Sequence, residues 1–220
     1  MNLGDNMRVI YLIRHSEGCS KSVIKNIQNS DSFQENNEKS ILSVVGEEKA
    51  RQLSELEELK NIDAVYSSNY VRCLATAKYL AEANDKVINV DERLGERIIG
   101  DIDGIDWYDF HQQQMKDFDY KRDGGESLNE TKKRMVEAIK NILMFETDNR
   151  VAVVTHSTAM SWLLSAWCEV GRNYHNEVIL SFNDDTIVDG QWTAPMVYKV
   201  EFDGMTVLSI ELLDIGEKSE

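Results

Sequence analysis

The sequence holds a single proline and only three cysteines, and it lacks any apolar run long enough to cross a membrane. One proline and twelve glycines among 220 residues exclude collagen-like and linker-like chains. Because a membrane helix needs roughly 20 consecutive apolar residues, we expect no membrane partner. The opening stretch MNLGDNMRVIYLIRHSE has no lysine and no small-residue cleavage pattern, so we also expect no signal peptide.

The cysteines form an odd, scattered set, Cys19, Cys73 and Cys168, without the spacing of a metal site. Such a set is typical of reduced thiols and predicts a cytoplasmic protein. Cys19 lies close to the polar residues that end the first apolar run. A redox role is therefore the alternative to an ordinary small side chain.

Acidic residues outnumber basic ones by 39 to 24, which gives a formal net charge of −15. Such a surface disfavours nucleic acid and anionic membranes as partners. It also repels phosphorylated molecules at long range, but screening limits that repulsion to about 8 Å at physiological salt. A local cluster of cations could therefore still bind a phosphate.

Apolar runs alternate with helix-like segments along most of the chain. The hydrophobic pattern predicts strands at 8–13, 63–68, 87–90 and 151–156, helices at 41–59, 70–84 and 157–170, and a helix that opens with the capping box SLNE at 127–130. Two further runs, 196–202 and 205–213, flank an Asp-Gly turn and predict a closing antiparallel hairpin. This alternation predicts an α/β fold, a three-layer α/β/α sandwich with a mostly parallel central sheet. We expect one such domain over residues 1–220.

Two polar segments interrupt the alternation. Residues 97–125, which include GDIDGIDWYDF, are polar and aromatic, and we interpret this segment as a small inserted cap. Residues 20–40 form another polar insertion, which we expect to be a loop beside the first strand.

Two of the predicted strands end on a histidine. VIYLI runs into Arg14 and His15, and VAVVT runs into His156. In open α/β sheets, ligands bind outside the carboxyl ends of the strands, and parallel strands share that edge. We therefore expect both imidazoles to face one site. A structural role is the alternative for each histidine taken alone.

Two arginines can reach the same edge. Arg14 adjoins His15, and Arg72 lies early in the helix after the second strand. The planar guanidinium fork fits phosphate oxygens, and two of them can hold a phosphoryl group from two sides. Ion pairs at the surface of a very acidic protein are the alternative for either arginine.

These residues lie in sequence blocks that resemble those of the histidine phosphatase superfamily, the phosphoglycerate-mutase-like proteins. The family opens with a strand and Arg-His-Gly-Glu, to which RHSE at 14–17 is similar. Further blocks follow in the family's order: LSVVGEEKA at 42–50, SSNYVRCLATA at 67–77, LGERIIGDIDG at 94–104, GGES at 124–127 and VVTHS at 153–157. The fold that the resemblance implies agrees with the one predicted from periodicity.

Several positions depart from the family's pattern. Ser16 replaces the usual glycine after the first histidine, and Ser157 replaces the glycine after the second. Lys21 stands where many members have an asparagine, and Ser20 stands where glycolytic mutases have an aromatic residue. We expect Ser16, Lys21 and Ser157 to line the phosphate pocket. The departures leave the chemical residues in place and argue against mutase activity.

The resemblance implies phosphoryl transfer through a phosphohistidine on His15. An imidazole attacks phosphorus only when neutral, and an unperturbed histidine has a pKa of about 6.5, which flanking arginines lower further. Arg14, Arg72 and His156 would bind the phosphoryl oxygens and stabilise the transition state. The resemblance assigns Glu96 as the acid that protonates the leaving oxygen and as the base that then activates water.

We therefore expect a phosphatase that acts on a small phosphorylated metabolite without a metal or cofactor. A phosphoglycerate-type mutase and a non-catalytic binding protein with the same fold are the alternatives. A metal site that includes His15 and Glu17 is a further alternative, but the chain has no HExxH or CxxC spacing.

Overall fold

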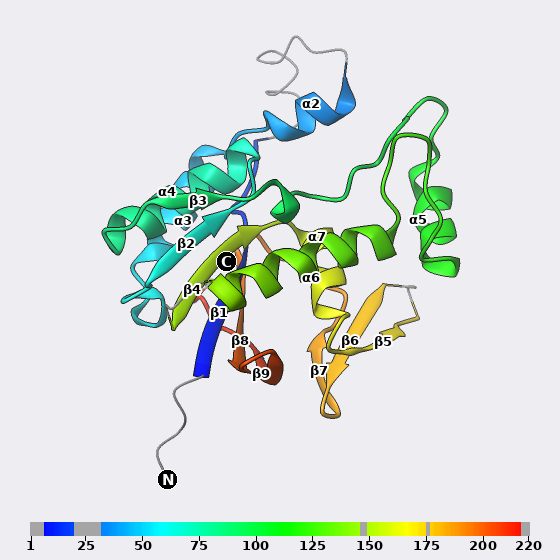
Figure 1. Ribbon diagram of the computed structural model, residues 1–220. Helices are drawn as coiled ribbons and strands as arrows, with labels where there is room; N and C mark the ends of the chain where they lie inside the picture. The colour runs from blue at the N-terminus through cyan, green and yellow to red at the C-terminus, as the bar shows by residue number, and fades with distance from the viewer. Residues whose placement is uncertain (1–6, 20–31, 146–148, 175–176, 217–220) are drawn as a thin grey trace.

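A six-stranded sheet lies at the centre of the protein, in the order β3-β2-β4-β1-β8-β9. The computed structural model describes residues 7–19, 32–145, 149–174 and 177–216 (Figure 1). The first four strands of the order run parallel, β8 is antiparallel to β1, and β9 is antiparallel to β8. This arrangement confirms the mostly parallel sheet and the closing hairpin. The strands are β1 (Met7–Arg14), β2 (Ala64–Ser67), β3 (Ile88–Val90), β4 (Arg150–Thr155), β8 (Met196–Asp203) and β9 (Thr206–Leu212).

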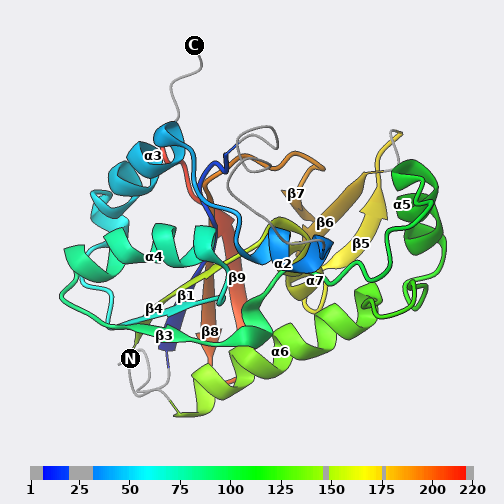
Figure 2. The ribbon, with the colours of Figure 1, turned by 90° about the horizontal axis from the view of Figure 1, so that it is seen from above.

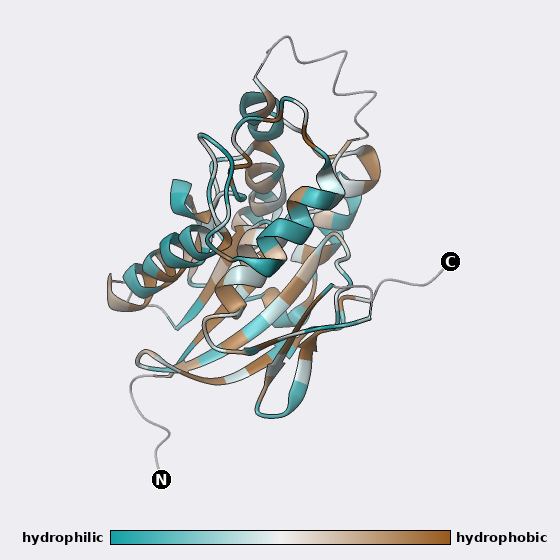
Figure 3. Ribbon diagram, turned by 90° about the vertical axis from the view of Figure 1, so that its right-hand side faces the viewer, coloured by the Kyte–Doolittle hydropathy of each residue, from teal (hydrophilic) through white to brown (hydrophobic). Residues whose placement is uncertain are grey.

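Helices cover both faces of this sheet and give the three predicted layers (Figure 2). The helices α3 (Val44–Ser54) and α4 (Val71–Ala83) pack on one face, and α6 (Leu128–Phe145) and α7 (Ser157–Leu164) pack on the other. Figure 3 shows that the helices carry both polar and apolar residues along their length, as helices with one buried side do. Among the described residues, no helix combines the length and the apolar character that crossing a membrane requires.

Strand β1 is buried on both of its sides. Its side chains alternate between the two faces, because successive residues of a strand point in opposite directions. Ile10 and Leu12 join the core under α6 and α7, whereas Tyr11 and Ile13 join the core under α3 and α4. Each of the four is at most 1 % exposed. The strand therefore holds the residues that follow it in a fixed place.

Side-chain caps set the starts of two of the predicted helices, α3 and α6. The Ser43 hydroxyl accepts a hydrogen bond from the Gly46 amide at 2.9 Å, which caps α3. At α6, the Ser127 hydroxyl accepts from the Glu130 amide at 3.1 Å, and the Glu130 carboxylate accepts from the Ser127 amide at 2.9 Å. This reciprocal pair confirms the capping box read at 127–130.

The helix predicted at 157–170 is shorter in the structure. It ends at Leu164, and the chain then turns into β5 (Glu169–Arg172). All four residues of β5 are exposed, so the sequence has no apolar pattern from which this strand could be predicted.

The strand β5 belongs to a second, three-stranded sheet that the sequence pattern did not predict. It pairs antiparallel with β6 (Val178–Phe182), which pairs antiparallel with β7 (Asp185–Val188). The β6–β7 turn holds Asn183 and Asp184 with φ angles of 50° and 69°. Two Asn or Asp residues at positive φ are typical of a two-residue hairpin turn, so this signal was readable in FNDD.

The cap segment 97–125 follows the 3-10 helix η2 (Glu92–Leu94) and contains α5 (Trp107–Lys116). Figure 1 shows α5 standing away from the central sheet, on the same side as β5 and β6. The Asp106 carboxylate caps α5 by accepting from the Asp109 amide at 3.0 Å. In the other polar insertion, α2 (Phe33–Glu38) forms a short helix where a loop was predicted; a further 3-10 helix, η1 (Glu57–Leu59), follows α3.

The segment after β1 is fastened to the start of α3. The Ser16 hydroxyl donates to the Gly46 carbonyl at 2.7 Å, and the Ser43 amide donates to the Glu17 carbonyl at 2.9 Å. The two backbones lie so close that a Cβ atom at Gly46 would stand 1.9 Å from the Glu17 carbonyl oxygen. Glycine at 46 is therefore required by space.

We expect Gly46→Ala to lower the free energy of unfolding by about 1–3 kcal/mol, because the added methyl overpacks this contact. Chemical denaturation with urea measures the change. Gly18→Ala is the matched control, since a Cβ there meets only the Ile41 carbonyl at an ordinary 3.7 Å. Equal stability of the two variants would contradict the argument.

Candidate active site

The two predicted histidines meet at the carboxyl edge of the central sheet. His15 directly follows β1 and His156 directly follows β4, and these strands are adjacent and parallel. The His15 amide donates to the Thr155 carbonyl at 2.9 Å, which extends the ladder to the edge itself. The imidazole centroids lie 5.2 Å apart in an edge-on arrangement. The register of the two strands therefore brings both rings into one site.

Arg72 connects the two imidazoles. It is the second residue of α4 and is only 7 % exposed. Its Nε donates to His15 Nε2 at 2.9 Å, and its Nη2 donates to His156 Nδ1 at 2.9 Å. Its Nη1 donates to the Asn37 carbonyl of α2. One guanidinium thus faces the lone pairs of both rings.

These contacts determine which ring nitrogens carry a proton. A guanidinium only donates hydrogen bonds, so His15 Nε2 and His156 Nδ1 must both be unprotonated. The remaining nitrogen of each ring then carries the hydrogen: His15 Nδ1 donates to the Ser16 carbonyl at 2.7 Å, and His156 Nε2 donates to the Ser68 hydroxyl at 3.0 Å. Both imidazoles are therefore neutral.

Burial and the neighbouring cations keep the rings neutral. Burial, followed by the charges of Arg72 and then Arg14, lowers the pKa of His15 to about 3, although the Ser16 carbonyl acts in the opposite direction. Burial, then Arg72, also lowers the pKa of His156 well below its ordinary value. At neutral pH the Nε2 lone pair of His15 is thus available for attack on an electrophile.

Arg14 is held by backbone carbonyls from the far end of the chain. Its Nη1 donates to the carbonyls of Trp192 and Thr193, both at 2.7 Å, in the loop between β7 and β8. Burial lowers the pKa of Arg14, but a guanidinium stays protonated in proteins. Among the described residues, its buried Nε has no hydrogen-bond partner.

Glu96 lies at the start of α7, next to His156. Its Oε1 accepts from the amides of Ala159 and Arg97, both at 2.9 Å, and its Oε2 accepts from the Thr158 amide at 3.2 Å. The helix N-terminus thus fixes the carboxylate. Of its two oxygens, Oε2 has the fewer hydrogen bonds.

The three residues expected around the phosphate have different places. Ser16 is fully buried, its hydroxyl bonds to Gly46, and its amide donates to the Thr76 hydroxyl at 3.0 Å, so its side chain is not brought to the site. Its carbonyl orients His15 instead. Ser157 opens α7 and lines a cavity beside the site. Lys21 lies outside the described residues.

Other contributors were not anticipated from the sequence. Ser68 directly follows β2 at the same edge and bonds to His156, a signal that the strand-end argument could have found. Tyr70 packs its ring 4.6 Å from that of His156 and 5.0 Å from the guanidinium carbon of Arg72. The carbonyls of Trp192 and Thr193 carry no sequence signal, since every residue has a carbonyl.

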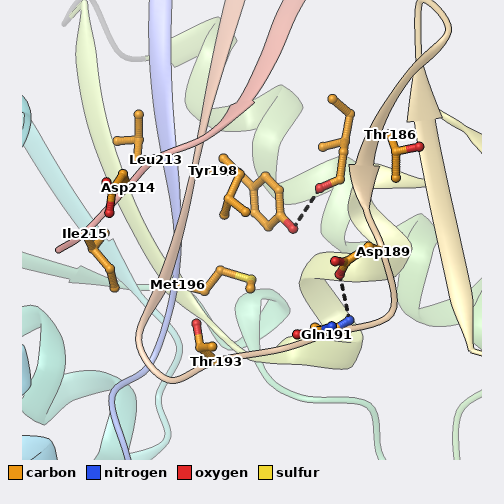
Figure 4. A pocket seen from close by; sticks show the side chains of 11 residues that line it. Thr186, Asp189, Gln191, Thr193, Met196, Tyr198, Leu213, Asp214 and Ile215 are labelled. Carbon is orange, nitrogen blue, oxygen red and sulfur yellow. Dashed lines mark hydrogen bonds between the residues drawn. The ribbon is translucent and has the colours of Figure 1, made fainter. Parts of the chain in front are cut away.

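Two cavities flank the loop that holds Arg14. The first, of about 350 Å³, lies between the cap, α7 and β6, and its walls include Ser157, Trp162 and Trp192. The second, of about 480 Å³, lies between the loop and the β8–β9 hairpin, with Thr193, Met196 and Tyr198 in its wall (Figure 4). The first cavity adjoins Glu96, because Thr158, whose amide donates to the Glu96 carboxylate, lies in its wall.

Comparisons with known proteins agree with this geometry. Residues 10–188 match the model of the histidine phosphatase superfamily (branch 1). A protein of Serratia proteamaculans named "Probable phosphoglycerate mutase GpmB" is 31% identical over 168 residues, which is 72% of this chain and 74% of that protein. The fold resembles a mycobacterial glucosyl-3-phosphoglycerate phosphatase, with a TM-score of 0.67, 19% identity, and coverage of 94% of this chain and 97% of the other. It also resembles a putative alpha-ribazole-5'-P phosphatase from Escherichia coli, with a TM-score of 0.64, 17% identity, and coverage of 94% and 96%.

We expect the free energy of unfolding to fall as the pH drops below about 6.5, where unfolded histidines take up a proton that folded His15 does not bind until about pH 3. The neutral, buried histidine contributes its full stabilisation above about pH 6.5. Between about pH 6.5 and pH 3 this contribution is lost, by up to about 1.4 kcal/mol per pH unit for each such histidine. Urea unfolding between about pH 7 and pH 5 should show a shallower loss in His15→Gln than in the wild type. Identical slopes would refute a neutral, buried His15.

Proposed function

The chain belongs to the histidine phosphatase superfamily, and on that premise we propose that it is a phosphatase that hydrolyses a small phosphomonoester through a phosphohistidine on His15. The observation that carries this proposal is the His15 Nε2 lone pair, kept unprotonated and aimed at Arg72. The phosphatases among the structural neighbours support the same class of reaction.

In the first step, phosphate oxygens replace the imidazole lone pairs as acceptors for Arg72, and the guanidinium of Arg14 donates from another side. Nε2 of His15 attacks phosphorus, the ester P–O bond breaks, and the electron pair leaves with the ester oxygen. A protonated Glu96 gives that oxygen its proton through Oε2. The Nδ1–H bond to the Ser16 carbonyl stabilises the positive charge that develops on the ring.

In the second step, water takes the place of the leaving group. The Glu96 carboxylate accepts a proton from the water, the oxygen attacks phosphorus, and the N–P bond breaks. Inorganic phosphate leaves, His15 returns to its neutral form, and Glu96 is protonated for the next cycle. The arginines supply the charge neutralisation that phosphoryl transfer needs, so no metal is part of this proposal.

A phosphoglycerate-type mutase is the second candidate, favoured by the name of the Serratia relative. A mutase must protect its phosphohistidine from water and hold a bisphosphorylated intermediate in a strongly cationic pocket. The cap beside this site is instead acidic, with Asp101, Asp106 and Asp109 exposed. Hydrolysis is therefore the better match for the described residues.

We expect His15→Ala to abolish hydrolysis of p-nitrophenyl phosphate, because no other group replaces the nucleophile. Wild-type protein mixed with a labelled phosphodonor and quenched should carry acid-labile phosphate, which the variant lacks. A circular dichroism spectrum confirms that the variant is folded. Retained turnover would rule out His15, and transfer of the label to an acceptor in place of water would favour the mutase.

We expect Arg72→Lys to lower kcat/KM by roughly 10³-fold, because an ammonium keeps the charge but cannot contact both histidines and the phosphate as a planar fork does. Arg51→Lys is the matched control, since Arg51 lies exposed on α3 and pairs with Glu48. A near-normal kcat in Arg72→Lys would show that Arg72 does not stabilise the transition state.

A further inference from the structure

Arg134, in the first half of α6, uses every hydrogen-bond donor of its guanidinium. Its Nε and Nη2 donate to the two carboxylate oxygens of Glu126 at 2.6 and 2.8 Å. The other bonds go to backbone carbonyls: Nη1 donates to those of Arg93 and Gly95 at 2.7 and 2.9 Å, and Nη2 donates to that of Glu96 at 3.1 Å. Because a guanidinium has five N–H donors, none remains for a ligand.

These carbonyls belong to the turn that carries Glu96 from the end of η2 into the cap. The remaining carbonyl of residues 93–96, that of Leu94, accepts from the Thr155 hydroxyl at 2.6 Å. Thr155 ends β4 and directly precedes His156. Each carbonyl of the turn is thus bound by a side chain of another element, either α6 or β4. The backbone of Glu96 is therefore held from two sides.

Glu126 extends this support beyond Glu96. Its Oε2 also accepts from the Ile98 amide at 3.0 Å, and its own amide donates to the Ile98 carbonyl at 2.8 Å. The side chains of Arg134 and Glu126 are only 18 % and 17 % exposed, so water competes little for these charge-assisted bonds. The pair thus fixes the chain on both sides of Glu96.

The carboxylate at the other end of Glu96 is bound by the amides of Thr158 and Ala159 at the start of α7. A proton passes to a leaving group only when the acid lies within hydrogen-bond reach of it. A displacement of about 1 Å can cost roughly 10²-fold in rate. A support that fixes the backbone of Glu96 therefore bears directly on its proposed chemistry.

We propose that Arg134 is a positioning residue for the reaction, which holds the backbone of Glu96 so that its carboxyl group meets the leaving oxygen. This inference rests on the proposed phosphatase function, in which Glu96 is the acid. Arg134 has no role in binding the substrate, because its donors are all occupied. Without the guanidinium, residues 93–96 lose three of their hydrogen bonds and the turn shifts. Proton transfer to the leaving group then suffers more than attack by His15.

The test compares two substrates of similar size, p-nitrophenyl phosphate and p-nitrobenzyl phosphate. The nitrophenolate leaves as a stable anion, whereas the benzyl alkoxide needs a proton from an acid. In Arg134→Lys, which keeps the charge but has too few donors for all these acceptors, kcat/KM should fall at least about tenfold more for the benzyl ester. This comparison uses two rates from one sample, so the folded fraction cancels. Arg150→Lys is the matched control, since Arg150 opens β4 and donates to the Glu58 carbonyl at 2.6 Å; it should leave the ratio of the two rates unchanged.

Glu96→Gln provides the reference, because it removes the acid itself and should lower the benzyl-to-phenyl ratio by roughly 10²-fold or more. The double variant Glu96→Gln with Arg134→Lys should have the ratio of Glu96→Gln alone, since a residue that acts through Glu96 then has no acid to position. A further fall in the double variant would contradict the proposal. An unchanged ratio in Arg134→Lys beside a lowered one in Glu96→Gln would overturn the role of Arg134 and leave the phosphatase in place. An unchanged ratio in Glu96→Gln would instead refute Glu96 as the acid, and this inference with it.

Discussion

One guanidinium that donates to two imidazoles at once is the interaction on which the site depends. Arg72 can contact both His15 and His156 only because β1 and β4 are adjacent, parallel and in a register that places Arg14 opposite Thr155. Its position at the start of α4 follows from the packing of that helix on the same sheet. The contact also selects the proton positions of both rings, so fold, tautomer and reactivity have a common origin.

The proposed function requires an acidic protein to bind an anion, and the burial of cations at the site meets that requirement. The chain has a net charge of −15, yet Arg72 is only 7 % exposed and contacts both histidines at the carboxyl edge of the sheet. Screening weakens the distant surface charges, whereas charges that are close together in a dry site interact strongly. Burial also lowers the pKa of His15, so the environment proposed to bind phosphate also keeps the proposed nucleophile neutral.

The central fold and the proximity of the two histidines could be predicted from the sequence, because both depend on patterns within single strands. Apolar runs that end on His15 and His156 indicate a shared sheet edge without any knowledge of the partners. The second sheet could not be found in this way, since β5 is wholly exposed. The place of Ser16 was also hidden: its hydroxyl bonds to the carbonyl of Gly46, 30 residues away, and no local pattern reports a carbonyl that only the tertiary fold brings near. For the same reason the support of Arg14 by residues 192 and 193 has no signature in the chain.

The backbone and the side chain of Trp192 have different roles. Its carbonyl accepts a hydrogen bond from Arg14, and its side chain lines the cavity beside the active site. Every amino acid has a backbone carbonyl, so another residue at position 192 can still accept the hydrogen bond from Arg14. A substitution of Trp192 can thus change the wall of the cavity and leave the hydrogen bond to Arg14 in place.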